Sequence, residues 1–209
     1  MNMQSMIKHI PVLALMATVF LSSCRKEELN PVATPEPGVW GQGKLLSGQF
    51  TAGADASSKV SMQLKWIDVN KKVTITKMEI FITMTERYTD KNGNPATANH
   101  GTKSYKVFDA KGNNEAVPFD ITANEVYTLF QTAKFDYGKG AGNQDVFTTA
   151  NGRPAGARFT KNDSFKMEWA FTSKDGLVYK WWSVSVVNGE VYVDQPDIAA
   201  NASVSWTVK

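Results

Sequence analysis

Hydrophobic and polar residues alternate along much of the chain after Trp40, which is the pattern of β-strands that bury one face. The alternation is clearest over residues 60–66 and again over residues 165–171. Short polar sequences rich in Asp, Asn and Gly separate these runs and favour tight turns. The pattern therefore predicts an antiparallel β structure from Trp40 to the end of the chain.

The strand that follows residue 72 changes phase. Its apolar positions are Val73 and Ile75 and then resume at Met78, so odd positions give way to even ones. Because side chains alternate between the two faces of a strand, one residue must slip out of register if all these positions are to face the core. We therefore expect a β-bulge at residues 76–77.

The C-terminal third of the chain predicts a hairpin around Lys174-Asp175-Gly176. A two- or four-residue turn here would place odd positions before the turn opposite even positions after it. The apolar residues that would then join the face of residues 165–171 are Val178, Trp182, Val184 and Val186. A further turn is expected at Asn188-Gly189. The apolar positions of the last strand are Ala202, Val204, Trp206 and Val208.

Helix signals prevail only in residues 121–130. Thr122 or Asn124 can cap a helix there, and Glu125 would lie in its first turn. The apolar face of this helix would consist of Val126, Leu129 and Phe130. Residues 90–95 predict a loop that precedes a strand over 104–108. Residues 138–156 are rich in glycine and lack periodicity, which predicts a long mobile loop.

About seven to nine strands with frequent turns and one short helix indicate an all-β fold, an antiparallel immunoglobulin-like β-sandwich. The Cys…Trp…Cys signature of antibody domains is absent, so only the architecture is inferred. A lipocalin-like β-barrel is the alternative. No linker-like break divides residues 40–209, which we interpret as a single domain.

The N-terminal segment has a different character. The first 23 residues contain no acid, and the apolar run of residues 10–21 is too short for a membrane-spanning helix, which needs roughly 20 residues. A run of this length is typical of a secretory signal. It ends in Leu21-Ser22-Ser23, followed by Cys24, the only cysteine of the chain.

This sequence resembles a bacterial lipoprotein signal. The resemblance implies a signal peptide over residues 1–23, cleavage before Cys24 and attachment of acyl chains such as palmitate to its thiol. Residues 24–39 would then form a flexible, proline-containing tether. The alternative is an ordinary cysteine near an apolar segment.

Residues 25–28, Arg-Lys-Glu-Glu, place a lysine and two acids just after Cys24. They resemble the surface-export signal of Bacteroidota lipoproteins, and the N-terminal region as a whole resembles that of accessory outer-membrane surface lipoproteins of nutrient- and glycan-uptake loci. The resemblance implies a lipid-anchored location on the outer membrane, facing outward. The implied partners are the membrane, polysaccharide, and an outer-membrane transporter or other proteins of a surface complex.

Composition excludes several other classes. The net charge is only +3 and is spread without basic blocks, which argues against nucleic acid as a partner. One Cys and two His cannot supply a disulfide scaffold or a zinc site built from Cys and His alone. No motif implies a cofactor.

Candidate catalytic chemistry is sparse. His100 is the only histidine after the signal peptide, and we expect it in a solvated loop with no nucleophile motif beside it. The glycine-rich residues 138–142 lack the spacing of a phosphate-binding loop. No sequence feature nominates a pair of carboxylates for glycoside hydrolysis.

A calcium loop is a weak candidate at Asp90, Asn92 and Asn94, whose oxygens have the alternate spacing of such loops. Gly101 stands where the bidentate acid should be, so an ordinary turn is the favoured interpretation.

The outward face of the predicted 164–186 hairpin is the candidate ligand site. Tyr179 and Trp181 would lie roughly 6–7 Å apart on this face, together with Lys166 and Glu168. Aromatic rings flanked by charged groups are typical of sugar binding. The alternative is that another segment covers this face and the rings belong to a second layer of the core.

We therefore expect a non-enzymatic, membrane-anchored lipoprotein that binds a glycan or another nutrient. A structural or adhesive subunit, or a protein-binding subunit, of a surface complex is the first alternative. A glycoside hydrolase-like enzyme is the second.

Overall fold

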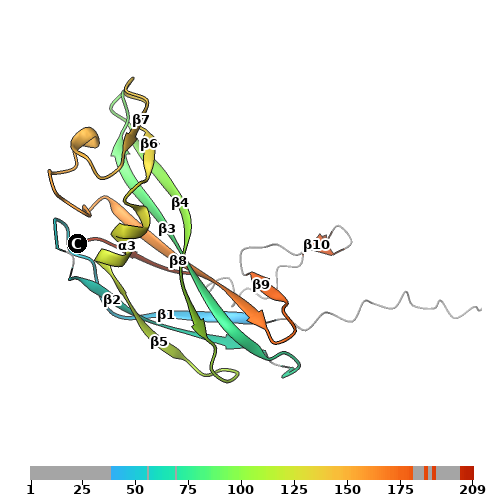
Figure 1. The fold of residues 1–209 in the computed structure, drawn as a ribbon. Coiled ribbons are helices and arrows are strands. Elements are labelled where there is room, and N and C mark those ends of the chain that lie inside the picture. The colour runs from blue at the N-terminus through green and yellow to red at the C-terminus, as the bar shows by residue number, and fades with distance from the viewer. Residues whose placement is uncertain (1–38, 56, 69, 181–185, 188–189, 192–202) are drawn as a thin grey trace, which may run out of the picture. The chain divides into compact units, whose positions relative to one another are not determined.

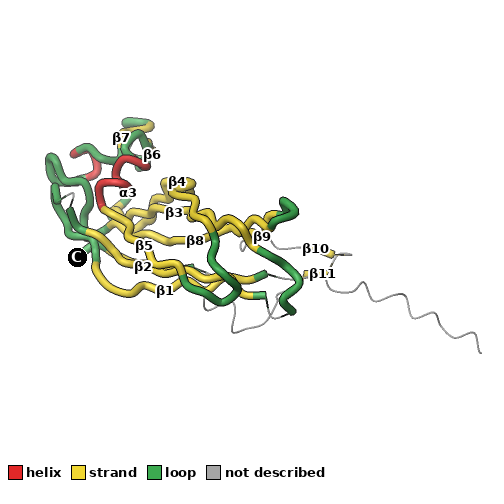
Figure 2. The backbone as a smooth tube through the Cα atoms, turned by 60° about the horizontal axis from the view of Figure 1, so that its bottom comes forward, coloured by secondary structure: helices red, strands yellow, loops and turns green. Residues whose placement is uncertain are grey.

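The computed structural model describes residues 39–55, 57–68, 70–180, 186–187, 190–191 and 203–209. These residues belong to one compact unit, Val39–Lys209. Two antiparallel sheets face each other as two layers (Figures 1 and 2), and the described residues contain one short α-helix, which confirms the all-β sandwich. The sheets of the described residues do not close into a barrel, so the lipocalin-like alternative is wrong.

The smaller sheet has three strands in the order β1-β2-β5, namely β1 (Trp40–Gly48), β2 (Lys59–Ile67) and β5 (Val117–Thr122). The alternation predicted for β2 is confirmed: Val60, Met62, Leu64 and Trp66 are buried, and the residues between them are not. β5 was not predicted, because its proline at position 118 is unfavourable in a strand. Pro118 is tolerated because β5 is an edge strand.

The larger sheet has the order β12-β8-β3-β4, and β9 pairs with the end of β8. Its strands are β3 (Ile75–Thr89), β4 (Pro95–Asp109), β8 (Asp163–Ser173), β9 (Val178–Lys180) and β12 (Val204–Thr207). The register between β3 and β8 shifts between Ile75 and Lys77, which confirms the predicted bulge. β4 begins directly after the turn at 90–94 and is much longer than the predicted strand.

The chain changes layers after β1. Phe50 forms a parallel bridge with Val208, and Gly53 forms an antiparallel bridge with Phe159. The N–H of Lys209 donates to the carbonyl of Phe50 at 3.0 Å. The segment after β1 is therefore attached to the end of the last strand, and this closes one side of the sandwich.

The core lies between the sheets and contains an aromatic cluster and a close backbone approach. The rings of Phe50, Phe159, Phe165 and Trp206 pack with centroids 5.0–5.9 Å apart. Trp169 is fully buried, and a methyl group built on Gly41 or Gly43 of β1 would overlap its indole. Glycine at these two positions lets β1 lie directly on the tryptophan.

The helix is α3 (Ala123–Phe130), and the predicted capping is confirmed. Thr122 is the N-cap, and its hydroxyl accepts from the N–H of Glu125 while the Glu125 carboxylate accepts from the N–H of Thr122. Val126 and Phe130 are buried, as expected for the apolar face, and Leu129 is partly buried against the core.

The glycine-rich segment is not the irregular loop that its lack of periodicity predicts. It completes a small hairpin of β6 (Lys134–Asp136) and β7 (Asn143–Asp145) and then forms a 3-10 turn, η1 (Thr149–Asn151). Further along, β10 (Val186–Val187) pairs with β11 (Glu190–Val191), as expected for a turn at 188–189.

Candidate functional site

The outer face of the larger sheet is formed by the side chains of β8, β3 and β4 that point away from the core. Lys166 and Glu168 of β8 lie on this face, as predicted, with Nζ and Oε1 2.9 Å apart. On β3 and β4, the hydroxyl of Ser104 donates to Oε1 of Glu79 at 2.6 Å. The outer face thus combines charged groups and hydroxyls in adjacent rows, in which the Lys166 side chain is 45% exposed and the Glu168 side chain 14% exposed.

Phe81 contributes an aromatic ring to the outer face. It pairs with Glu168 on one side and with Ser104 on the other, and it is half-buried. The sequence pattern did not single out Phe81, because its apolar neighbours Ile80 and Ile82, both fully buried in the core, define the apolar face of β3. Its odd position among even core positions was the signal that could have found it.

Tyr179 does not share this face, so that part of the predicted site is wrong. It pairs with Phe171 and packs against the core, while Val178 pairs with Thr172 and is exposed. The N–H of Ser173 donates to the carbonyl of Leu177, which encloses a turn of three residues instead of two or four. A turn of three residues pairs odd positions of β8 with odd positions of β9, so Tyr179 lies opposite Phe171. Gly176, at φ +87°, supplies the residue in left-handed conformation that such a turn requires.

Two further predicted residues, Trp181 and Cys24, lie outside the described residues. The weak calcium candidate is a turn in which Oδ1 of Asp90 accepts from the N–H groups of Asn92 and Asn94, each at 2.8 Å. In the described part of the chain, no group of three or more His, Cys, Asp or Glu side chains is placed to hold a metal ion. Nor does any described helix have the length and apolar character to cross a membrane.

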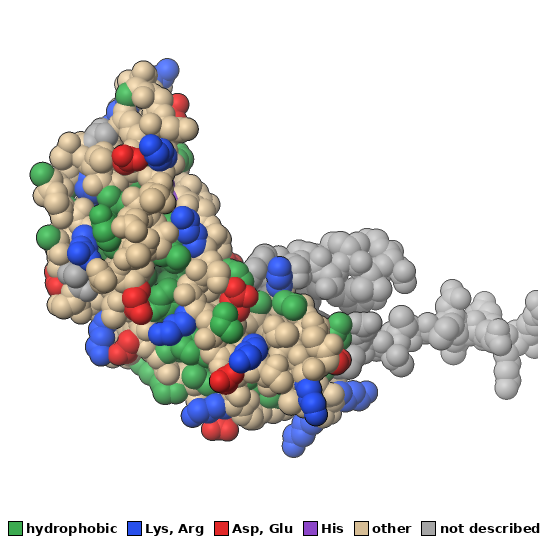
Figure 3. All heavy atoms as spheres, viewed as in Figure 1, with side chains coloured by type: hydrophobic (Ala, Val, Ile, Leu, Met, Phe, Trp, Pro, Cys, Tyr) green, Lys and Arg blue, Asp and Glu red, His purple; other side chains and the backbone are tan. Residues whose placement is uncertain are grey.

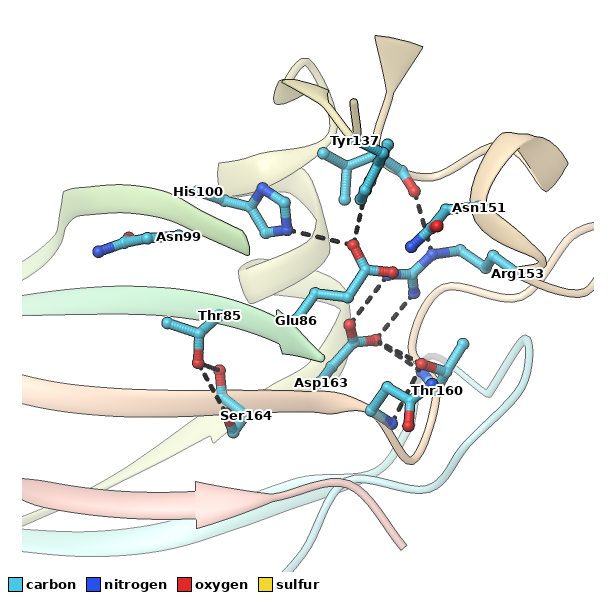
Figure 4. Close-up of polar contacts among 12 residues, drawn as sticks. Thr85, Glu86, Asn99, His100, Tyr137, Asn151, Arg153, Thr160, Asp163 and Ser164 are labelled. Atoms are coloured by element: carbon cyan, nitrogen blue, oxygen red, sulfur yellow. Dashed lines mark hydrogen bonds and ion pairs between the residues drawn. The ribbon is translucent and has the colours of Figure 1, made fainter. Parts of the chain in front are cut away.

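The most concentrated polar cluster is buried, and the sequence did not reveal it (Figure 4). Arg153 binds both oxygens of Asp163 with N–O distances of 2.8 and 2.9 Å and contacts Oε1 of Glu86 at 3.0 Å. Tyr137 donates to Oε2 of Glu86 at 2.6 Å. Nε2 of His100 lies 3.3 Å from that same oxygen. We call these five residues the Arg153 cluster.

Local sequence positions each member of the Arg153 cluster. Glu86 ends the buried row of β3, and Asp163 begins β8 beside it. His100 lies within β4, not in a solvated loop as predicted, and its side chain has no exposed surface. Two residues of β4, His100 and Gly101, stand opposite one residue of β3, and Gly101 has φ +86°. This glycine bulge turns the imidazole inward.

Burial and partners set the protonation of the cluster. Burial by itself raises the pKa of Glu86, but the contacts with His100 and Tyr137 and the charge of Arg153 outweigh it, so this pKa lies below its usual value. Burial raises the pKa of the Asp163 carboxyl in spite of its pairing with Arg153. Burial and the bond to Glu86 raise the pKa of Tyr137.

The Arg153 cluster therefore holds structure together. Its acids are paired with Arg153, and the guanidinium also donates to the carbonyls of Val146 and Arg158, at 3.0 and 3.2 Å. One side chain thus fixes the segment after β7 to the ends of β3 and β8. We assign no substrate to this cluster, because its paired side chains are buried.

The chain was also compared with known proteins. No protein-family model and no curated protein matches it. The features of the chain that bear on its function are therefore the N-terminal sequence and the outer face of the larger sheet.

Proposed function

We propose that this chain is a lipid-anchored outer-membrane lipoprotein whose sandwich domain faces outward and binds a glycan or another nutrient ligand without catalysing a reaction on it. The anchor is Cys24, and residues 24–39 form the tether. The support for the anchor is the apolar run that ends in Leu21-Ser22-Ser23-Cys24, and the support for the outward orientation is Arg25-Lys26-Glu27-Glu28.

The observation that carries the binding role is the composition of the outer face. The half-buried ring of Phe81 lies between Glu168 on β8 and Ser104 on β4. An apolar ring packs against the C–H face of a sugar, and carboxylate, ammonium and hydroxyl groups beside it form hydrogen bonds with the sugar hydroxyls. Lys166 and Glu79 extend the polar rows on either side.

The alternative of an adhesive or protein-binding subunit is favoured by one observation, the edge of β1. This strand of nine residues forms ladder hydrogen bonds only with β2 among the described strands. An edge without a ladder partner in the described part of the chain is the feature that strand addition uses. The hydrolase alternative has less support. The buried acids Glu86 and Asp163 are both engaged by Arg153 and would not serve as an acid–base pair.

Fatty-acid labelling tests the anchor. Cells grown with an alkyne fatty acid should label the wild-type chain and leave Cys24→Ala unlabelled, because the thiol is the acceptor of the acyl chain. Equal labelling of the two chains would contradict the anchor.

A polysaccharide panel tests the binding role. The domain should bind at least one polysaccharide with a Kd between micromolar and millimolar, about 4–8 kcal/mol, because a shallow face leaves most of its ligand in water. Phe81→Ala should abolish this binding, and Glu168→Gln should weaken it.

Glu115→Gln is the matched control for the charge, because Glu115 lies in the turn between β4 and β5, outside the strands that form this face. Thermal melts run on the same samples separate loss of binding from loss of folding. Failure of the panel, or binding that Phe81→Ala leaves intact in a folded domain, would move the assignment to the adhesive alternative.

A further inference from the structure

Three turns meet at the end of the sandwich where the tether joins the domain. Trp40, the first residue of β1, pairs with Ile67 at the end of β2. The N–H of Asn114 donates to the carbonyl of Trp66, and the N–H of Lys174 donates to the carbonyl of Thr74, both at 2.8 Å. We call Trp40 and the residues of these turns, 68, 70–74, 110–115 and 174–178, the tether end.

Exposed lysines gather at the tether end. Lys71, Lys72 and Lys174 are exposed, and none of them forms a salt bridge within the described part of the chain. Lysine side chains protrude at the ends of β3 and β8, at the lower right of Figure 3.

Two of the three acidic side chains of the tether end are engaged by neighbouring groups. The Asp68 carboxylate is buried and accepts from the N–H groups of Asn70, Lys72 and Val73 at 2.7–2.8 Å. Glu115 pairs with Lys111 at 3.7 Å. Asp175 is exposed and remains as an opposing charge in the β8–β9 turn. The exposed charge of the tether end is therefore positive.

Two large apolar side chains accompany these lysines. Leu177 is 54% exposed and Val178 is 53% exposed, and both follow Lys174 at the tip of the β8–β9 hairpin. Exposed aliphatic side chains next to lysines are the combination that binds the headgroup region of a bilayer, where the cations meet phosphates and the aliphatic groups enter the acyl boundary.

We infer that the tether end docks on the anionic, phosphate-bearing lipid surface of the membrane that holds the Cys24 anchor. This inference rests on the lipid anchor of the proposed function. The 16 residues from Cys24 to Val39 reach at most about 55 Å when fully extended, so the bilayer is always within reach of this end. A basic surface is one of the signals that strengthen membrane attachment by acyl chains.

The opposite end of the sandwich supplies a matched control. Arg87, Lys91 and Lys161 are exposed there, around the β3–β4 turn and beside the start of β8. The backbone N–H of Arg87 donates to the carbonyl of Asn162 at 3.0 Å, so Arg87 lies beside the start of β8. Reversing these three charges changes the net charge of the domain as much as reversing Lys71, Lys72 and Lys174.

Vesicle binding tests the inference with the 39–209 fragment, whose buried core is built from its own residues. The probes are phosphatidylcholine vesicles with and without about 30 mol% of the anionic lipid phosphatidylglycerol. The fragment should prefer the anionic vesicles, and added salt should weaken the binding. Lys71→Glu/Lys72→Glu/Lys174→Glu should lower the affinity at least about tenfold.

The control Arg87→Glu/Lys91→Glu/Lys161→Glu should stay within about twofold of the wild-type affinity, since only the tether end contacts the bilayer. Leu177→Ser/Val178→Ser should weaken binding and leave its salt dependence in place. No preference for anionic vesicles, or an equal loss in the control, would overturn the docking surface. Because the fragment lacks Cys24, that result is independent of fatty-acid labelling, which alone decides the anchor.

Discussion

Arg153→Met tests whether the Arg153 cluster holds the segment after β7 in place. Methionine fills similar space but cannot pair with an acid, so the substitution leaves the carboxylates of Asp163 and Glu86 buried without their cation. Removal of one partner from a buried ion pair costs about 3–5 kcal/mol, because an uncompensated charge remains in a medium that solvates it poorly. For a domain of this size each kcal/mol lowers the Tm by about 2–4 °C, so we expect a fall on the order of 10 °C.

The assay is urea unfolding of the 39–209 fragment at pH 7, with Lys59→Met as the matched control. Lys59 pairs with Asp120 at 2.6 Å, but these side chains are 56% and 42% exposed, so the control should cost less than about 1 kcal/mol. The triple variant Arg153→Met/Glu86→Gln/Asp163→Asn should recover part of the loss, because it removes the stranded charges. If Arg153→Met costs no more than Lys59→Met, the cluster does not hold this segment.

Three further predictions concern the core, the helix and acid stability. Trp169→Ala should lower the unfolding free energy by about 3–5 kcal/mol in the same assay, because the indole is fully buried under Gly41. Glu168→Ala, on the opposite face of β8, should lower it by about 1 kcal/mol or less, and equal losses in the two variants would contradict the face assignment. Glu125→Ala should cost about 1 kcal/mol, since it breaks the capping box of α3, and Glu115→Ala is its exposed control. Burial alone would raise the pKa of Asp68, but the N–H groups of Val73, Lys72, Asn70 and Lys71 hold this pKa below its usual value. The ionised Asp68 therefore stabilises the fold fully above the unfolded-state pKa of about 4, and this stabilisation is lost as the pH falls through the lower pKa of the folded state. Asp68→Asn should therefore reduce the loss of unfolding free energy that the wild type shows below a pH of about 4. A variant whose stability falls with pH as steeply as that of the wild type would refute this role of Asp68.

The parts of the fold that could be predicted are those that local sequence decides. The alternation of residues 60–66 identified β2, and the phase change between Ile75 and Met78 located the bulge, because a strand with one buried face allows only one register. The helix was also predictable, since its capping signals lie within three residues of each other.

The candidate site was harder to predict, for two physical reasons. The sequence Lys174-Asp175-Gly176 is compatible with turns of several lengths. The positive φ of Gly176, which accompanies a turn of three residues, is a feature of the folded backbone. The wrong turn length moved Tyr179 to the wrong face. The Arg153 cluster depends on contacts between residues 67 positions apart, such as Arg153 and Glu86, and no local pattern reports them.

The two ends of the sandwich have different roles in this proposal. β3 and β8 run from the tether end to the Arg153 cluster, so docking of the tether end would place the cluster and the β6–β7 hairpin farthest from the bilayer. The outer face, with Phe81 midway along β3, would then stand upright beside the membrane, open to a polymer that approaches from the side. In such an arrangement the distal loops receive no support from the membrane. A buried arginine bound to two acids and two carbonyls supplies that support from within the domain.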